Sequence, residues 1–137
     1  MYLFDTDIIT TILKPKPSRW LIERLSFIPE KDQYISTITI SEIVYGAMKS
    51  HRQEYHLKNL EEILLPAVNI AGFDTKAGYI CGRLRADLEK KGQPLPLADL
   101  EIAAIAIAGN FTLVTGNLKH FTRIDDLKIE NWLDAPA

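Results

Sequence analysis

The sequence predicts an α/β fold in which a mostly parallel sheet has helices on both faces. Short apolar segments, typical of buried strands, alternate along the chain with longer segments whose apolar residues recur at helical spacing. We find no internal repeat and no linker, and 137 residues are enough to bury one hydrophobic core. We therefore expect residues 1–137 to form a single domain built on a sheet of four to five strands.

The predicted strands are short, and the first one is directly followed by acids. Tyr2-Leu3-Phe4 places three large apolar residues in a row, and Asp5-Thr6-Asp7 comes next. The other predicted strands are apolar segments bounded by turn residues, and they cover residues 34–37, 68–70, 111–115 and 127–129. The first strand therefore presents carboxylates at an edge of the sheet, where ligands of open α/β sheets bind.

Helices are predicted where apolar residues recur at helical spacing between breaking prolines and glycines. Their predicted ranges are 8–13, 19–27, 39–49, a segment that ends at Pro66, 74–91 and 97–108. We expect Thr6 or Asp7 to cap the first helix, and Thr39-Ile40-Ser41-Glu42 to open the third as a capping box. The last helix is apolar almost all round, which indicates that it is buried.

The composition excludes a membrane-spanning protein and a protein that binds nucleic acid by charge alone. The longest apolar run, near residues 102–108, is far shorter than the roughly 20 residues that span a bilayer. The formal net charge of -2 argues against purely electrostatic binding of nucleic acid. No signal sequence opens the chain, and the single Cys81 cannot form an internal disulfide, so we expect a cytoplasmic protein.

Four oxygen-bearing side chains are expected at the same edge of the sheet. Asp5 follows the first strand, Glu42 lies near the start of the helix after the second strand, Asp99 is in the first turn of the buried helix, and Asn117 follows the strand at 111–115. Each has a structural alternative, because acids and asparagine also cap helices or occupy turns. Capping does not explain why every such position on this edge carries an oxygen ligand.

Carboxylates gathered in this way need a cation, because otherwise they repel one another. Hard oxygen ligands without paired cysteine or histidine select Mg²⁺ or Mn²⁺ over zinc. Such an ion polarises a phosphoryl oxygen and lowers the pKa of a bound water. The sequence therefore predicts metal-assisted hydrolysis of a phosphodiester or a phosphomonoester.

Five stretches match a known family in order and span nearly the whole chain. They are Leu3-Phe4-Asp5-Thr6, Ile40-Ser41-Glu42-Ile43-Val44-Tyr45-Gly46-Ala47, Pro96-Leu97-Ala98-Asp99-Leu100-Glu101-Ile102-Ala103-Ala104, Thr115-Gly116-Asn117-Leu118-Lys119-His120-Phe121 and Ile129-Glu130-Asn131-Trp132. On these stretches the chain resembles the PIN-domain ribonucleases, and specifically the VapC-type toxins of type II toxin–antitoxin modules. The resemblance implies a three-layer α/β/α domain with Mg²⁺-dependent endoribonuclease activity, in which Mn²⁺ can substitute. It also implies a homodimer and a cognate antitoxin that blocks the acidic edge with a basic side chain.

Carried over residue by residue, the resemblance makes Asp5, Glu42 and Asp99 the acidic metal-binding positions. Asn117 stands at a fourth position that is aspartate in many relatives, which leaves one metal or two as alternatives, because an amide contributes no charge. In the implied mechanism, a metal held by Asp5 and Asp99 binds the scissile phosphate. A water oriented by Glu42 or Asp99 then attacks in line and leaves a 5′-phosphate and a 3′-hydroxyl.

Other residues are expected to support the site or to contact RNA. Thr6 and Thr115 are small polar residues beside the acids, and Thr115 matches the helper that the family has after its last core strand. Asp7 stands where many relatives have asparagine, so it either adds charge to the edge or caps the helix. Candidate phosphate contacts, for which a solvated face is the alternative, are Lys14, Lys16, Arg19, Lys119, His120 and Arg123.

Two other functions fit parts of the sequence. In a HAD-like phosphatase, Asp5 would be a nucleophile and Asp7 an acid or base, with Asp125-Asp126 as a later motif. That alternative gives Glu42 and Asp99 no function. The second alternative is a non-catalytic PIN-like binding module that acts through a partner, and the complete set of three acids argues against it.

Overall fold

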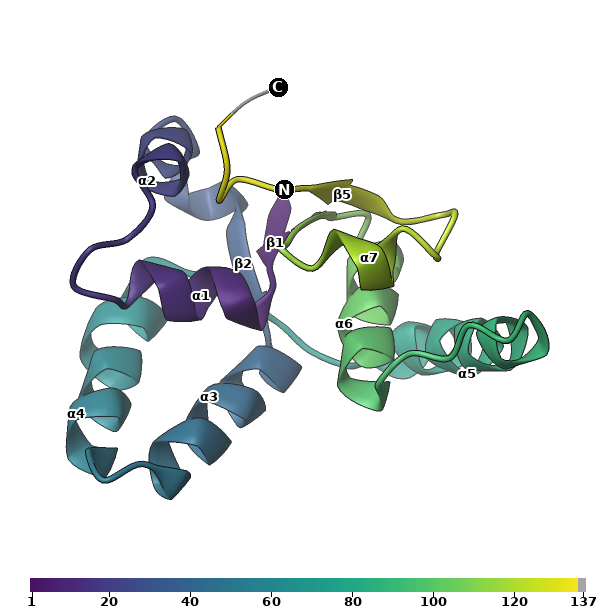
Figure 1. The fold of residues 1–137 in the computed structure, drawn as a ribbon, viewed down its shortest axis with the longest axis horizontal. Coiled ribbons are helices and arrows are strands. Elements are labelled where there is room, and N and C mark those ends of the chain that lie inside the picture. Colours follow the sequence, from purple (N-terminus) through teal and green to yellow (C-terminus); the bar gives the residue numbers. More distant parts are fainter. Residues whose placement is uncertain (136–137) are drawn as a thin grey trace.

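The computed structural model describes residues 1–135 and contains a parallel sheet of five strands (Figure 1). The strands are β1 (Tyr2–Phe4), β2 (Gln33–Ser36), β3 (Asn69–Ala71), β4 (Thr112–Val114) and β5 (Lys128–Glu130). Their order in the sheet is β3-β2-β1-β4-β5, and every neighbouring pair is parallel. The predicted parallel sheet is therefore confirmed, with β1 in its middle.

Helices lie on both faces of the sheet, so the expected three-layer α/β/α architecture is confirmed (Figure 1). They are α1 (Thr6–Ile12), α2 (Arg19–Leu25), α3 (Thr37–Lys49), α4 (Gln53–Lys58), α5 (Thr75–Lys90), α6 (Leu97–Ala108) and α7 (Leu118–Phe121). Three shorter segments are the 3₁₀ helices η1 (Glu30–Asp32) and η3 (Leu65–Ala67) and the π-helix η2 (Asn59–Leu64). No helix in residues 1–135 is long and apolar enough to cross a membrane.

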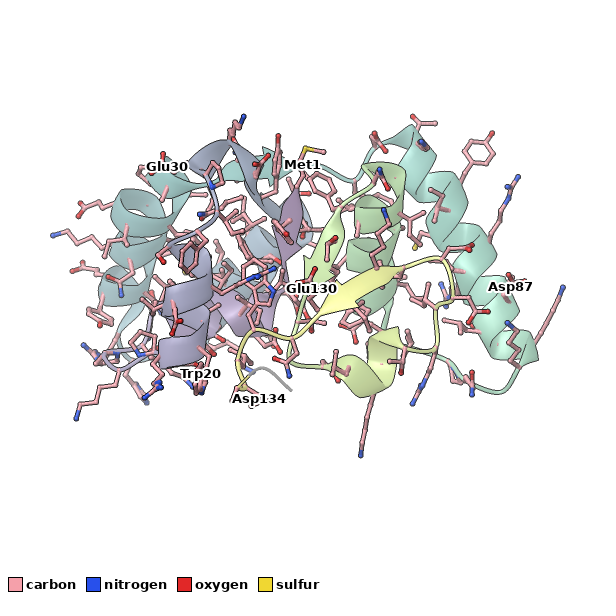
Figure 2. All side chains as sticks on the ribbon, turned by 90° about the horizontal axis from the view of Figure 1, so that it is seen from above. Met1, Trp20, Glu30, Asp87, Glu130 and Asp134 are labelled. Atoms are coloured by element: carbon pink, nitrogen blue, oxygen red, sulfur yellow. The ribbon has the colours of Figure 1, made fainter. Side chains whose placement is uncertain are left out.

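The side chains of β1 divide the core between the two faces of the sheet, because successive residues of a strand point to opposite sides. Leu3 packs with buried residues of α5, α6 and α7, whereas Phe4 packs with Ile8 and Ile9 of α1 and with α2. Figure 2 shows α5, marked by Asp87, far from α2, marked by Trp20. Each fully buried side chain of this size contributes about 1.5–3 kcal/mol, so both layers fix the position of β1.

Helix α3 begins earlier than predicted, and the expected capping box is wrong. The hydroxyl oxygen of Ser36, the last residue of β2, accepts a hydrogen bond from the Thr39 N–H at 3.0 Å. The helix therefore starts at Thr37, directly after the strand, because Ser36 already satisfies a backbone donor that a helix start leaves free. Thr39 is consequently the capped residue, and Glu42 lies in the second turn.

Two other regions also differ from the prediction. The helix that was expected to end at Pro66 is α4 followed by η2 and η3, and Pro66 lies inside η3. Proline is tolerated there because the first N–H groups of a helical turn have no partner within it. Helix α7 was not predicted, since a four-residue turn is too short to produce a periodic apolar pattern.

Candidate active site

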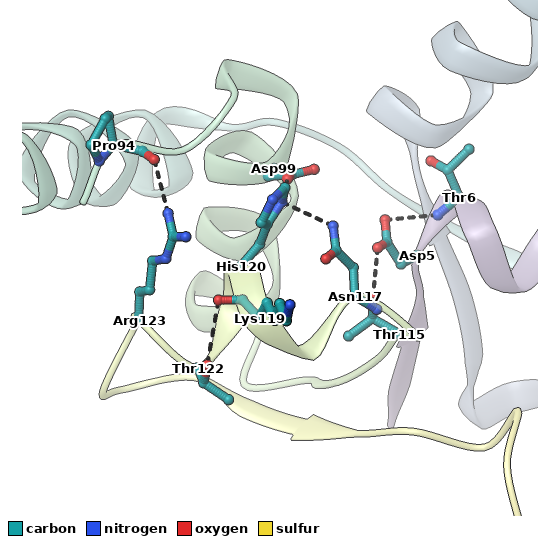
Figure 3. A network of polar contacts seen from close by, with 10 residues as sticks. All are labelled: Asp5, Thr6, Pro94, Asp99, Thr115, Asn117, Lys119, His120, Thr122 and Arg123. Atoms are coloured by element: carbon teal, nitrogen blue, oxygen red, sulfur yellow. Dashed lines mark hydrogen bonds and ion pairs between the residues drawn. The ribbon is translucent and has the colours of Figure 1, made fainter.

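Asp5 lies at the carboxyl end of the central strand and caps the helix that follows. Its Oδ1 accepts a hydrogen bond from the Thr6 N–H at 2.8 Å, so α1 begins at Thr6, and the expectation that Thr6 or Asp7 caps it is wrong. Its Oδ2 accepts a hydrogen bond from the Thr115 hydroxyl, also at 2.8 Å (Figure 3). Both oxygens of this buried carboxylate are therefore held in place.

The pKa of Asp5 is raised from 3.8 to about 6, and burial is the largest cause. The nearby carboxylates of Asp7 and, to a smaller extent, Asp99 also raise this pKa, whereas the hydrogen bonds from Thr115 and Thr6 lower it. The balance shows that the surroundings disfavour a negative charge on Asp5. A bound cation would reverse that balance.

Asp7 faces the same place from the first turn of α1. Its Oδ2 accepts a hydrogen bond from the Gly116 N–H at 2.9 Å, whereas its Oδ1 is buried and has no hydrogen-bond partner among residues 1–135. Burial, followed in smaller measure by the Asp99 carboxylate, raises the pKa of Asp7. A Cβ atom at Gly116 would lie 2.9 Å from Asp7 Oδ2 and 2.7 Å from the Leu133 side chain, so this contact requires glycine.

Glu42 reaches the site from α3 and is held by a threonine of α1. The Thr6 hydroxyl lies 2.7 Å from Glu42 Oε1 and 3.1 Å from the Thr39 hydroxyl. A hydroxyl has one proton, and the carboxylate is the stronger acceptor, so Thr6 donates to Glu42 and accepts from Thr39. Thr39 is in turn 3.3 Å from the Ser36 hydroxyl, which ties Glu42 back to the end of β2.

Asp99 enters the site from the first turn of α6 and meets the short helix α7. Its Oδ2 lies 2.7 Å from His120 Nδ1, and the Asn117 amide nitrogen lies 2.9 Å from the same ring nitrogen (Figure 3). The Asn117 N–H donates a hydrogen bond to the Thr115 hydroxyl oxygen at 3.0 Å. Asn117 thus stands between the side chain that holds Asp5 and the side chain that contacts Asp99.

The predicted residues come together around one shallow cavity, which we call the acid depression. It has a volume of about 300 Å³, and its lining residues are Asp5, Thr6, Asp7, Thr10, Glu42, Asp99 and Asn117. Every acid that the sequence singled out on this edge lines it, and Thr115 supports it from beneath through Asp5. Asp7 belongs to the site and is not the cap of α1.

The predicted basic residues are more scattered. Lys14 borders a groove of about 410 Å³ that also contains Thr6 and Glu42, so it lies beside the acid depression. Arg19 stacks over Trp20, and Arg123 donates a hydrogen bond to the Pro94 carbonyl at 3.1 Å. Lys16, Lys119 and the other predicted basic residues do not line the acid depression.

The sequence did not indicate the contact that His120 makes within the site. His120 was a candidate contact for RNA phosphate, and its Nδ1 lies 2.7 Å from Asp99 Oδ2. The available signal was the spacing Asn117-x-x-His120, which puts both side chains on one face of a helical turn. That signal could be used only if the turn itself had been predicted.

The HAD-like alternative loses its later acidic motif. Asp126 borders a separate small cavity with Asn110 and Lys128. Asn110 precedes β4, whereas the acid depression lies beyond the carboxyl end of that strand, so Asp126 is at the opposite end of the sheet from Asp5. It cannot act together with Asp5.

The donor set suits a hard cation that keeps part of its water shell. Within residues 1–135, no three His, Cys, Asp or Glu side chains converge closely enough to form a complete protein cage. Mg²⁺ is commonly bound by only one or two carboxylates, with water completing its octahedron. The unpartnered Asp7 Oδ1 and the raised pKa of Asp5 indicate that negative charge here lacks compensation from the protein.

Comparison with known proteins identifies the family. The sequence model of the PIN domain matches residues 2–127. Ribonuclease VapC2 of Rickettsia felis is 36% identical over 132 residues, which cover 96% of this chain and 98% of the relative. The tRNA(fMet)-specific endonuclease VapC of Salmonella typhimurium is 34% identical over 131 residues, which cover 96% of this chain and 97% of the relative.

Solved structures agree with the sequence comparison. The VapBC2 complex of Rickettsia felis, bound to a DNA fragment from its promoter, contains a chain that superposes with a TM-score of 0.88 and 36% identity, covering 96% of this chain and 98% of that one. A chain of VapBC-1 from nontypeable Haemophilus influenzae superposes with a TM-score of 0.88 and 33% identity, covering 97% and 98%. This chain therefore belongs to the PIN-domain family, and within it to the VapC ribonucleases.

Proposed function

We propose that this chain is a metal-dependent endoribonuclease that hydrolyses RNA phosphodiester bonds and acts as the toxin of a type II toxin–antitoxin pair. The observation that carries the proposal is the acid depression, which Asp5, Glu42 and Asp99 line from three different parts of the chain. The relatives named ribonuclease VapC and tRNA(fMet)-specific endonuclease support RNA as the substrate. Because its proposed substrate is RNA, we place the chain in the cytoplasm. We also propose that residues 1–137 act as one domain.

Asp5 and Asp99 would hold the metal ion, Mg²⁺ or Mn²⁺. When bound, the ion supplies charge stabilisation for the phosphate and a water of lowered pKa. Thr115 and the Thr6 N–H keep Asp5 oriented, as their hydrogen bonds of 2.8 Å indicate. Glu42 has one oxygen engaged by Thr6, and its Oε2, which has no hydrogen-bond partner among residues 1–135, can take a proton from the attacking water.

The groove beside the acid depression provides a path for the RNA backbone. Lys14, Arg52 and His56 border it, together with Tyr55, and the groove reaches Thr6 and Glu42. Basic side chains that lead toward an acidic metal site compensate for the net charge of -2 where phosphate approaches. The proposed partner is an antitoxin, which inhibits the enzyme by placing a basic side chain in the acid depression. The VapBC complexes of the relatives support an antitoxin as partner. The toxin itself works as a homodimer.

Cleavage of structured RNA by the purified chain tests the proposal. We expect cleavage with Mg²⁺, none with excess chelator, and almost none by Asp5→Asn, with products that carry a 5′-phosphate. Asp87→Asn on α5 is the matched control, because it makes the same change on an exposed residue remote from the site. Cleavage that persists in chelator or in Asp5→Asn would refute the metal mechanism, and no cleavage of any RNA would favour a binding module.

A further inference from the structure

We propose that His120 is a positioning residue that orients the Asp99 carboxylate, and that it is not an RNA contact. This inference rests on the proposed function, since it assigns the support of one metal-holding acid. Asp99 is in the first turn of α6, and His120 is on α7, a helix that follows the next strand. The distance of 2.7 Å between Asp99 Oδ2 and His120 Nδ1 is in the range of strong charge-assisted hydrogen bonds.

The proton on His120 can be assigned from its two neighbours. One ring nitrogen cannot donate to Asp99 and accept from the Asn117 amide at the same time. The carboxylate accepts only, so the Nδ1 proton belongs to the bond with Asp99, and Asn117 then turns its amide oxygen toward that N–H. Asp99 Oδ2 is thereby fixed, whereas Asp99 Oδ1 has no hydrogen-bond partner among residues 1–135.

The start of α6 has an unusual need for such support. Pro96 is its N-cap and provides no side-chain hydrogen bond to the helix. The segment is instead held at two points: Arg123, two residues after α7, donates to the Pro94 carbonyl at 3.1 Å, and His120 of α7 contacts Asp99 (Figure 3). These contacts hold the approach to α6 and its first turn against residues 120–123.

Helix α7 is itself fixed well enough to orient another residue. Phe121, next to His120, is completely buried in the core beneath α6. Its other end is joined to the site through the Asn117 N–H, which donates to the Thr115 hydroxyl, and Thr115 donates to Asp5. The segment 115–120 therefore positions two acids of the acid depression, one through Thr115 and one through His120.

Titration of the metal-free protein with Mn²⁺ alone, followed by calorimetry, measures this role directly. We expect His120→Ala to weaken Mn²⁺ binding by roughly tenfold, the low end of the effect of removing an outer hydrogen-bond partner of a metal site. We expect His120→Asn to recover most of the loss, because its amide can donate near the position of Nδ1. Thr122→Ala, an exposed residue at the end of the same helix, is the matched control and should bind Mn²⁺ as the wild type does.

Cleavage kinetics separate the two functions considered for His120. Orientation of Asp99 predicts that His120→Ala lowers kcat at a given Mn²⁺ concentration with little change in KM for RNA. An RNA contact would raise KM and leave Mn²⁺ binding unchanged, and that result would overturn the inference. Circular dichroism of each variant checks that α7 has not unfolded.

Nitrogen NMR of the imidazole in the metal-free protein provides a readout that does not depend on activity. We expect a proton on His120 Nδ1 in the wild type and a changed spectrum in Asp99→Asn. An unprotonated Nδ1, or a His120→Ala variant that binds Mn²⁺ as tightly as the wild type, would overturn the inference and leave the proposed function intact. A wild-type chain that binds no Mn²⁺ and cleaves no RNA would instead overturn the proposed function and the inference with it.

Discussion

Replacing Asp5 by asparagine should make the metal-free protein more stable at neutral pH while it abolishes cleavage. The carboxylate is buried, and its pKa is raised to about 6 in the folded protein from 3.8. Asparagine keeps an acceptor for the Thr6 N–H, and its amide can donate to the Thr115 hydroxyl. The variant therefore removes an unfavourable buried charge and keeps a hydrogen bond with each neighbour, although the Thr115 hydroxyl then accepts that bond and no longer donates it.

The size of this effect follows from the pKa shift. A folded-state pKa above the unfolded value means that the ionised carboxylate opposes folding, so stability falls as the pH rises from 3.8 through about 6. A shift of this size corresponds to about 3 kcal/mol once Asp5 is fully ionised, at about pH 7.5. At about pH 4 the penalty is below about 1 kcal/mol, because the group is largely protonated in the folded state and partly protonated in the unfolded chain.

Urea denaturation with excess chelator at both pH values measures the difference in the free energy of unfolding between wild type and Asp5→Asn. We expect the variant to gain up to about 3 kcal/mol at neutral pH, and much less in acid. Asp87→Asn is the control and should show no such dependence on pH. Added Mg²⁺ should raise the Tm of the wild type but not of Asp5→Asn, because only the wild type binds the ion. An Asp5→Asn variant that is less stable at neutral pH, or whose gain does not change with pH, would refute this reasoning.

Three further substitutions test how the site is built. Gly116→Ala should lower the free energy of unfolding by about 1–3 kcal/mol, because its Cβ would lie 2.9 Å from Asp7; a neutral result in urea denaturation would show that this contact can relax. Ser36→Ala should cost about 1 kcal/mol through the lost cap of α3, measured in the same way, and an unchanged midpoint would contradict the assigned cap. Glu42→Gln should slow RNA cleavage by roughly 10²-fold or more while the circular dichroism spectrum is unchanged; wild-type rates would exclude Glu42 as the base.

The elements with a strong apolar pattern were predicted well from the sequence. Helix α6 spans Leu97–Ala108 as expected, and each expected strand is present within about two residues of its predicted ends. Helix α6 and strands β1, β2 and β4 contain fully buried positions, and their apolar sequences record that burial directly. The errors fall where hydrogen bonds of single side chains decide the boundary, as at Ser36 before α3, or where the helical spacing changes, as in η2.

The acid depression was predictable because of the parallel sheet. Strands that run in the same direction bring their carboxyl ends to one edge, so Asp5 and Asn117, each a residue or a few beyond a strand, had to approach each other. The approach of Asp99 depends instead on where α6 crosses the sheet, and that of His120 on an unpredicted turn. The apolar periodicity of the sequence predicts neither the path of α6 across the sheet nor the turn that carries His120.

Three of the four acids of the site share one structural principle, which explains why the sequence analysis did not find their partners. Each of the three is held by a side chain from another part of the chain: Asp5 by Thr115, Glu42 by Thr6 and Asp99 by His120, over separations of 110, 36 and 21 residues. The helix that carries a carboxylate can hold one of its two oxygens through a backbone N–H. A residue from elsewhere in the chain is then needed to fix the second oxygen. Loss of a partner should therefore misplace one acid without unfolding its helix. Substitutions at Thr115 and His120 should therefore lower activity more than they lower stability.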